Sequence, residues 1–205
     1  MYDQVISDLR QSYNRMVEER DKKEIASWKT EERYQFLSLL QKEGRKNLLE
    51  IGAGTGTHGK FFQDSGLEVV CTDLSPEMVK LCQKKGLTAY VMDFLNLDFP
   101  DGSFDAIYAL NCLLHVPRKD LPSVLKVIQG LLKPRALLYL GQYGGLEREG
   151  TWLEDHYEPK RFFSFLSDDQ IKEITAEFFQ LLYFKQIPLE GEPDFHFQSM
   201  ILRRS

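Results

Sequence analysis

Three glycines at alternate positions carry the clearest chemical signal in the sequence. Gly52, Gly54 and Gly56 follow the apolar run 48–51, in which Glu50 is the one acidic residue. The pattern predicts a buried strand, a tight turn and the start of a helix. Glycines suit such a turn because they reach positive φ and have no Cβ to keep a ligand from the backbone. Since free N–H groups at a helix start favour an anion, the turn is predicted to hold a charged, nucleotide-like molecule.

Further polar side chains follow the next predicted strands. Asp73 and Asp93 each end a strand, and Asn111 opens the loop after the strand 104–110, which also carries His115. In a parallel sheet these ends meet at one edge, where ligands bind near the switch in strand order. Asp73 can accept hydrogen bonds from a ribose. His115 has the near-neutral pKa of a substrate ligand or base, although it fits packing against the N-terminal helix equally well.

The elements that position these residues alternate between strands and helices. This rhythm predicts an α/β fold with a doubly wound, mostly parallel sheet. The short loop before the last strand suits an antiparallel pair, so the last of seven predicted strands is antiparallel. Three residues are predicted helix N-caps: Thr30, Ser75 and Ser167. The predicted strands span residues 48–51, 67–72, 87–92, 104–110, 136–141, 181–187 and 195–202.

The length of 205 residues fits a single domain. Its expected parts are an N-terminal helical segment, a ligand-binding core, an insertion or lid over the ligand edge, and a C-terminal helix with antiparallel strands. They span residues 1–43, 44–142, 143–166 and 167–205.

Composition limits the class of protein. The chain is 42% hydrophobic and 28% charged, as in soluble globular proteins, and its net charge of −5 argues against nucleic acid as a partner. No apolar run is long enough to span a bilayer and the N-terminus lacks a signal core, so we expect a cytoplasmic protein. Three scattered cysteines, Cys71, Cys82 and Cys112, predict free thiols and neither a disulfide nor a metal site.

Two ligands compete for the glycine turn. Residues 54–59 satisfy the G-x-G-x-x-G pattern of dinucleotide-binding folds, with Asp73 at a suitable distance for a ribose. In that motif, however, the first glycine follows the strand directly, and here that glycine is Gly52, which gives G-x-G-x-G. A carboxylate at Glu50 would repel a pyrophosphate but would suit a cationic amine.

The segment LLEIGAGTG resembles the first motif of the class I S-adenosylmethionine-dependent methyltransferases. CTDLSPEMVKLC, VMDF and FDAIYALNCLLHVP resemble later motifs of that family, and FHFQSMILRR resembles its last, antiparallel strand. The sequence departs from the family at Arg135 and Ala136, where a Gly-Gly pair usually precedes the fifth strand.

The resemblance implies a Rossmann-like methyltransferase fold and S-adenosyl-L-methionine as cofactor. Asp73 would bind the ribose hydroxyls, Leu74 and Met78 would flank the adenine, and Asp93 with the backbone N–H of Phe94 would read the adenine edge. The implied cofactor-binding residues are Glu50, Gly52, Ala53, Gly54, Gly56, Asp73, Leu74, Met78, Asp93, Phe94 and Asn111.

The resemblance further implies methyl transfer to a small-molecule acceptor, with His115 as a candidate catalytic residue. The insertion offers candidates for the acceptor pocket: Tyr143, Trp152, His156, Tyr157 and Arg161. Arg161 would hold an acceptor carboxylate or phosphate, or else would pair with Glu154, Asp155 or Glu158. The N-terminal aromatic residues Tyr2, Tyr13 and Trp28 are candidates to close over the cofactor, although core packing suits Trp28 better.

Two other functions remain open on the sequence. One is a non-catalytic S-adenosylmethionine-binding module that regulates a partner, and the other is an NAD-dependent oxidoreductase. Turnover of the cofactor would separate the first from an enzyme, and a nicotinamide-binding titration would settle the second. The sequence specifies neither the acceptor atom nor the oligomeric state.

Overall fold

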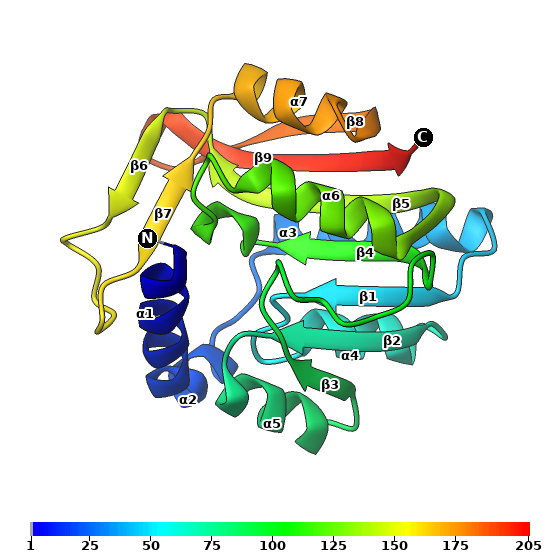
Figure 1. The fold of residues 1–205 in the computed structure, drawn as a ribbon, viewed down its shortest axis with the longest axis horizontal. Coiled ribbons are helices and arrows are strands. Elements are labelled where there is room, and N and C mark those ends of the chain that lie inside the picture. Colours follow the sequence, from blue (N-terminus) through cyan, green and yellow to red (C-terminus); the bar gives the residue numbers. More distant parts are fainter. Residues whose placement is uncertain (1) are drawn as a thin grey trace.

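The computed structural model describes residues 2–205, and within them a seven-stranded mixed sheet forms the centre of the molecule (Figure 1). Its strand order is β3-β2-β1-β4-β5-β9-β8. The strands are β1 (Asn47–Ile51), β2 (Glu68–Asp73), β3 (Thr88–Val91), β4 (Phe104–Leu110), β5 (Leu132–Gly144), β8 (Phe179–Leu189) and β9 (Glu192–Arg204).

Strand pairing confirms the predicted fold class. β1 pairs in parallel with β2 and with β4, and β4 pairs in parallel with β5. The last strand, β9, is antiparallel to both β5 and β8. The chain runs outward from β1 to β3 and then returns to place β4 on the other side of β1. The switch point of this doubly wound sheet therefore lies between β1 and β4, where such sheets bind ligands.

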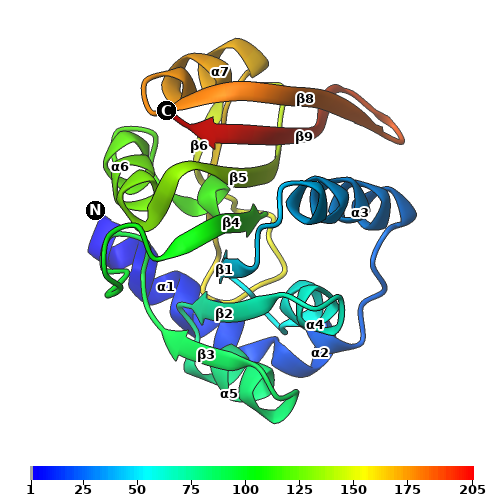
Figure 2. The ribbon, with the colours of Figure 1, turned by 90° about the vertical axis from the view of Figure 1, so that its right-hand side faces the viewer.

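Helices cover both faces of the sheet because alternate strand residues are apolar on both sides (Figure 2). Leu48 faces α3, α4 and α5, whereas Leu49 faces α6 and α7. The helices are α1 (Tyr2–Arg15), α2 (Val17–Asp21), α3 (Ser27–Lys42), α4 (Thr57–Asp64), α5 (Pro76–Lys84), α6 (Leu121–Leu131) and α7 (Asp168–Ala176), with a 3₁₀ turn η1 (Leu113–His115) after β4.

Two of the three predicted N-caps are confirmed. The Ser75 hydroxyl accepts from the Met78 N–H at 3.2 Å, and Ser167 forms a capping box with Gln170. The prediction for Thr30 is wrong. Its N–H already bonds to the Ala26 carbonyl, because α3 begins one turn earlier than the sequence pattern indicated.

Arg135 takes the backbone conformation for which the resembling family uses glycine. Its φ is 60°, in the left-handed region that costs an ordinary residue about 1–2 kcal/mol. The Arg135 carbonyl accepts a hydrogen bond from Arg45 Nη2 at 3.0 Å. The turn is therefore formed without glycine inside β5, at the register shift between β4 and β5, and parallel pairing with β4 continues from Leu137.

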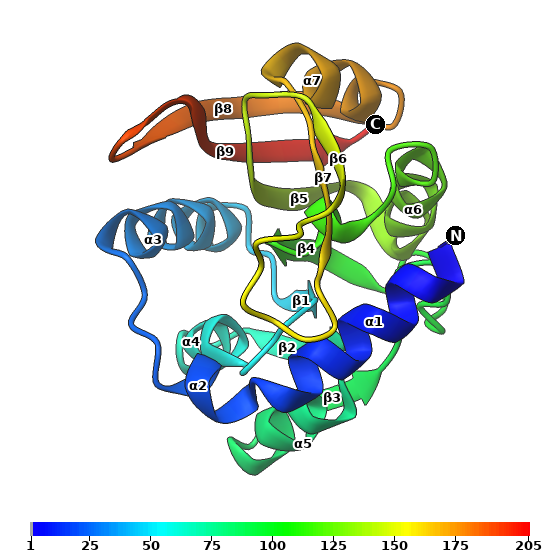
Figure 3. The same ribbon diagram turned by 90° about the vertical axis from the view of Figure 1, so that its left-hand side faces the viewer.

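Two segments distant in sequence lie at the carboxyl ends of the parallel strands (Figures 1 and 3). One is α1 with α2. The other is the antiparallel pair β6 (Arg148–Thr151) and β7 (Phe162–Phe165), joined by the loop 152–161. Helices long and apolar enough to cross a membrane are absent from residues 2–205.

Candidate functional site

A cavity of about 70 Å³ lies at the carboxyl ends of β1, β2 and β4, beside the switch point. Its floor, as we call the side formed by strand ends and the glycine turn, includes Gly52, Gly54 and Asp73. Its roof is formed by Leu9, Tyr13 and Arg20 of the N-terminal helices. Seven predicted site residues line it: Gly52, Gly54, Asp73, Leu74, Phe94, Asn111 and His115.

The glycine turn of the floor needs its glycines for space as well as for conformation. Gly52, Gly54 and Gly56 have φ of 63°, 55° and 77°. A Cβ on Gly52 would lie 2.4 Å from Cys112 Cβ, which is an overlap of atoms. The turn is therefore held against the loop that follows β4, and its backbone borders the cavity directly.

Asp73 ties the end of β2 to the glycine turn. Its Oδ2 accepts from the Gly54 N–H at 2.8 Å and its Oδ1 accepts from the Ser75 N–H at 2.8 Å. Burial raises the pKa of this carboxyl, and the backbone hydrogen bonds act in the opposite direction. A carboxylate has about four acceptor positions. Two are used here, so Asp73 retains capacity for hydroxyl groups of a ligand in the cavity.

Glu50 lies outside the cavity, under α4. Strand alternation directs residue 50 to the same sheet face as Leu48, so its carboxyl group meets Cys71 Sγ at 3.5 Å. A Cβ on Gly59 would lie 2.6 Å from Glu50 Oε2. Burial raises the pKa of Glu50 to about 8, so at neutral pH it is protonated. Geometry gives Glu50 a packing role, and its expected contact with a cationic amine stays a prediction.

Other predicted cofactor residues shape the cavity from outside. The Asp93 carboxylate accepts from the Leu95 and Asn96 N–H groups, which fixes the loop that presents Phe94. Met78, in the first turn of α5, is fully buried, and Ala53 packs in the α3–α5 face of the core. Gly56 is the N-cap of α4.

The roof is fastened by side chains. Arg20 Nη1 donates to the Tyr157 hydroxyl at 3.2 Å, and the Arg20 guanidinium lies 5.0 Å from the Tyr13 ring centre. Within the described chain, the buried Nε of Arg20 has no hydrogen-bond partner. Arg20 Nη2 comes within 3.9 Å of a Cβ position on Gly54. The roof therefore places a cation directly over the glycine turn.

His115 links the loop after β4 to the roof. Its Nδ1 lies 2.7 Å from the Phe162 carbonyl oxygen and its Nε2 lies 2.7 Å from the Tyr13 hydroxyl. A carbonyl only accepts, so Nδ1 carries the proton and Nε2 accepts from Tyr13. Burial lowers the pKa of His115 to about 3, so the ring is neutral at physiological pH.

Arg161 has a carboxylate partner, in agreement with the second of its two predicted roles. Its Nε donates to Asp155 Oδ2 at 2.8 Å and its Nη2 donates to Oδ1 at 2.9 Å. The guanidinium stacks 3.5 Å from the Tyr157 ring centre, and Nη1 donates to the Tyr13 hydroxyl at 3.3 Å. Arg161 thus ties the loop 152–161 to α1, and its charge is balanced.

The remaining acceptor candidates Tyr143, Trp152 and His156 are not among the described residues that line the cavity. Tyr143 stacks on Phe195, and Trp152 packs edge-on against Phe163. His156 is 67% exposed at the side chain, 3.9 Å from Glu19. Trp28 packs on Phe197, with ring centres 4.6 Å apart, as its core-packing alternative expected.

Sequence reasoning missed four residues of the cavity lining: Leu9, Arg20, Leu110 and Cys112. A signal existed for the roof. Leu9, Tyr13 and Arg20 are four and seven positions apart, which places them on one face of a helix. The pattern gives no hint of what that face covers.

Comparisons with known proteins agree with this geometry. Residues 48–135 match the family model described as a methyltransferase domain. The ubiquinone biosynthesis O-methyltransferase of Xanthomonas axonopodis pv. citri is 30% identical over 115 residues, which are 53% of this chain and 47% of that protein. The demethylmenaquinone methyltransferase of Paenarthrobacter aurescens is 35% identical over 106 residues, 50% of this chain and 40% of that protein. The chain thus spans less than half the length of these relatives.

Solved structures share the fold over the whole chain. The 1,6-didemethyltoxoflavin-N1-methyltransferase of Burkholderia thailandensis, with bound S-adenosylhomocysteine, has a TM-score of 0.73 at 21% identity and covers 100% of this chain and 89% of its own. The magnesium protoporphyrin IX methyltransferase of Synechocystis PCC 6803, with bound S-adenosylmethionine, has a TM-score of 0.72 at 15% identity, with coverages of 98% and 97%.

Proposed function

We propose that this chain, whose residues 48–135 match a methyltransferase domain, is a class I S-adenosylmethionine-dependent methyltransferase that transfers the methyl group of S-adenosylmethionine to a small-molecule acceptor. The observation that carries the proposal is the floor of the cavity. There the Asp73 carboxylate and the glycine turn are hydrogen-bonded to each other at the switch point of the sheet.

The residues of the cavity fit this cofactor. Asp73 has acceptor capacity for the two ribose hydroxyls, and Phe94 and Leu74 provide apolar surface for the adenine. The Arg20 guanidinium, with its unpartnered Nε, suits the cofactor carboxylate. Asn111 Oδ1, buried and unpartnered in the described residues, suits the ammonium. These assignments join the floor and the roof around one ligand.

Bound S-adenosylmethionine supplies a sulfonium-activated methyl group with a good leaving group. The chain's own contribution is mainly alignment of the two reactants, which is worth roughly 7–11 kcal/mol in well-oriented systems. A base adds about 10²–10⁴-fold to the rate where the acceptor is protonated. We assign that role to His115, whose Nε2 accepts from the Tyr13 hydroxyl at the cavity. Because burial holds its pKa at about 3 in this structure, the role requires the roof to open and hydrate the ring. An acceptor hydroxyl that replaces Tyr13 would meet this nitrogen.

The acceptor side is proposed to lie beneath the segment 143–166, with Tyr143, Trp152, His156 and Tyr157 around it. A small acceptor is supported by the names of the relatives, which include quinone-pathway methyltransferases, and by the net charge of −5, which disfavours nucleic acid. We further propose a cytoplasmic setting. Its support is that Cys71, Cys82 and Cys112 are free and buried.

Calorimetric titration tests the cofactor assignment. S-adenosylhomocysteine is expected to bind with a stoichiometry of one and NAD is expected not to bind. Binding of NAD without a response to S-adenosylhomocysteine would refute the proposal. A panel of dihydroxyphenyl and amino-heterocyclic acceptors, assayed for release of S-adenosylhomocysteine, then separates an enzyme from a non-catalytic binding module.

A further inference from the structure

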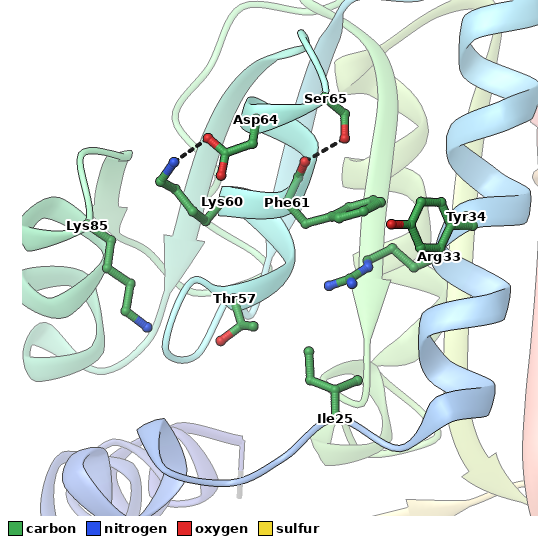
Figure 4. Close-up of a pocket in the computed structure, with 9 residues that line it drawn as sticks. All are labelled: Ile25, Arg33, Tyr34, Thr57, Lys60, Phe61, Asp64, Ser65 and Lys85. Carbon is green, nitrogen blue, oxygen red and sulfur yellow. Dashed lines mark hydrogen bonds and ion pairs between the residues drawn. The ribbon is translucent and has the colours of Figure 1, made fainter.

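A second and larger cavity, of about 610 Å³, lies on the outer side of α4 (Figure 4). It opens between α4, α5, the chain 22–26 and α3. Within residues 2–205, its lining shares no residue with that of the cofactor cavity. The lining residues are Ile25, Arg33, Tyr34, Thr57, Lys60, Phe61, Asp64, Ser65 and Lys85.

We propose that this cavity is a second ligand site, which binds a small molecule carrying a phosphate or carboxylate group on an apolar or aromatic body. The site goes beyond the proposed methyl transfer, because within residues 2–205 its lining includes none of the cofactor and acceptor residues proposed above. Thr57, which follows Gly56 directly, is the lining residue next to that turn.

Arg33 is the strongest argument for an anion. The residue is only 8% exposed, yet its Nε has no hydrogen-bond partner in the described part of the chain. Nη1 reaches no closer than 3.4 Å to His58 Nδ1. A buried cation without a carboxylate is unfavourable unless another anion pairs with it. Figure 4 shows the guanidinium extending from α3 into the space before Thr57.

The neighbouring charges favour the same class of ligand. Arg33, Lys60 and Lys85 outnumber the one acidic lining residue, Asp64, in a chain whose net charge is −5. Lys60 pairs with Asp64, and Lys85 pairs with Asp21 and donates to the Thr55 carbonyl at 2.8 Å. Arg33 therefore remains the lining cation that lacks an acidic partner.

The start of α4 adds polar groups to the same space. The N-cap of this eight-residue helix is Gly56, which offers no side-chain oxygen to the N–H groups of the first turn. The Thr57 hydroxyl lies 3.0 Å from the Thr55 hydroxyl, and either of them can donate to a ligand. An oxyanion between Arg33 and Thr57 would thus meet a guanidinium, a hydroxyl and a positive helix end.

The apolar residues of the lining define the rest of the ligand. Arg33 stacks 3.8 Å from the centre of the Phe61 ring, which holds the guanidinium plane fixed for bidentate contact. Tyr34, on α3, is 54% exposed, and Ile25 lines the cavity from the segment 22–26. The volume falls within the range of about 300–1,000 Å³ that is typical of small-molecule sites. A bare anion would leave this surface unused, so the ligand is expected to carry a ring or an alkyl chain.

Calorimetric titration of the full chain with phenyl phosphate and with benzoate, at low ionic strength, tests the site. We expect one equivalent of at least one probe to bind, and the preferred probe assigns a phosphate or a carboxylate ligand. Arg33→Gln is expected to weaken binding at least about tenfold. The matched control is Lys126→Gln, which removes one positive charge from an exposed position on α6, on the opposite sheet face, and is expected to leave binding unchanged.

A second variant keeps the test decisive if Arg33→Gln fails to fold. Lys60→Gln changes a side chain that is 40% exposed and is expected to weaken binding about threefold. The titration is repeated with saturating S-adenosylhomocysteine, which is expected to leave the probe affinity unchanged. Competition would place the probe in the cofactor cavity and overturn the proposal. Failure of both probes to bind, or binding that neither variant weakens, would overturn it as well.

Discussion

The floor and the roof of the cofactor cavity are held by different kinds of contact. On the floor, Asp73 bonds to the backbone N–H of Gly54, 19 positions away, and Gly52 packs against Cys112. In the roof, Arg20 bonds to Tyr157 and Tyr13 bonds to Arg161, pairs that are 137 and 148 positions apart. The floor is therefore held by backbone groups and close packing at the strand ends, whereas the roof depends on side-chain contacts between residues 13–20 and 157–161.

This difference indicates which part moves. The cavity volume is about 70 Å³, while sites for nucleotide-sized ligands measure about 300–1,000 Å³. Movement of the floor would break close packing inside the sheet. Movement of the roof exchanges a few polar side-chain contacts, each worth about 0.5–1.5 kcal/mol, for contacts with water or ligand. Cofactor entry is thus expected to displace α1 and the loop 152–161.

The largest expected effect is on the floor. Gly52→Ala forces a Cβ to within 2.4 Å of Cys112 Cβ at φ 63°, so we expect the free energy of unfolding to fall by about 2–5 kcal/mol. The control is Gly44→Ala, with a similar φ of 66° but open space around the added methyl group. That variant should lose only about 1–2 kcal/mol. Urea denaturation measures both, and equal losses would show that the floor is not closely packed.

A roof variant is expected to come next. Arg161→Met leaves the buried Asp155 carboxylate without its bidentate partner. Removing one partner of a fully buried pair costs about 3–5 kcal/mol, and we expect about 2–3 kcal/mol here because the pair is near the surface. Lys160→Met is the control, since Lys160 belongs to a more exposed pair with Glu158. If the two variants are equally stable by urea denaturation, Arg161 does not fasten the roof.

The difference between the floor and the roof also explains which features of the protein could be predicted from the sequence. The strand positions, the doubly wound sheet and the residues of the cavity floor followed from hydrophobic runs, glycine spacing and acids at strand ends, all of which are local signals. The antiparallel last strand followed from one short loop. At Glu50 the spacing before the glycines predicts a cofactor contact, whereas strand alternation places the side chain on the α4 face, so that role stays a prediction.

The side-chain contacts of the roof could not be predicted from short-range patterns in the sequence. The sequence shows that Arg161 has acidic neighbours, but the choice of Asp155 and the contact with Tyr13 depend on how α1 meets the loop 152–161. The same holds for Arg20, which is one of several charged residues in a polar helix. Contacts between segments so distant in sequence are set by the packing of the whole fold.

On the floor, the side chain of Asp73 is expected to control cofactor affinity. Asp73→Ala removes the acceptor proposed for the ribose, so we expect binding of S-adenosylhomocysteine to weaken by about 1.5–3 kcal/mol. Asp73→Asn, which keeps one acceptor oxygen, should lose less. Calorimetry measures both, with thermal denaturation as a check, because the Gly54 and Ser75 N–H groups also lose their partner. Unchanged affinity in the alanine variant would refute the ribose assignment.

The pH dependence of stability separates the two regions again. His115 under the roof and His58 have pKa values lowered by burial to about 3, from 6.5, so from pH 6.5 downward the unfolded chain takes up two protons that the folded chain does not. Glu50, behind the floor, has a pKa raised by burial to about 8 from 4.5, so the folded chain keeps one proton that the unfolded chain loses.

These three groups predict a maximum of stability near pH 6.5. From about pH 4.5 to 6.5 the unfolded state binds one more proton than the folded state, so stability rises with pH by about 1.4 kcal/mol per unit. From about pH 6.5 to 8 the folded state binds one more proton than the unfolded state, so the free energy of unfolding falls by about 1.4 kcal/mol per pH unit. Urea denaturation across this range measures both slopes. Glu50→Gln should flatten the upper slope and steepen the lower slope to about 2.7 kcal/mol per unit, because Glu50 no longer offsets one of the two histidine protons. A decline above pH 6.5 that persists in this variant would exclude Glu50 as its cause.

The smallest expected effect on stability comes from a variant that tests whether loosening the roof strengthens or weakens cofactor binding. Tyr13→Phe removes the hydroxyl that donates to His115 Nε2 and accepts from Arg161, but keeps the ring against Tyr157. We expect a loss of about 0.5–1.5 kcal/mol in the free energy of unfolding. Because the closed roof competes with the cofactor for space, the same loss should make opening easier. Binding of S-adenosylhomocysteine should therefore tighten by a few fold, opposite in sign to the floor variant Asp73→Ala. Tyr90→Phe, at an exposed position on β3, is the control and should change neither quantity. Weaker binding by Tyr13→Phe would instead mean that the Tyr13 hydroxyl contacts the bound cofactor, so that Tyr13 would belong to the binding surface together with Arg20.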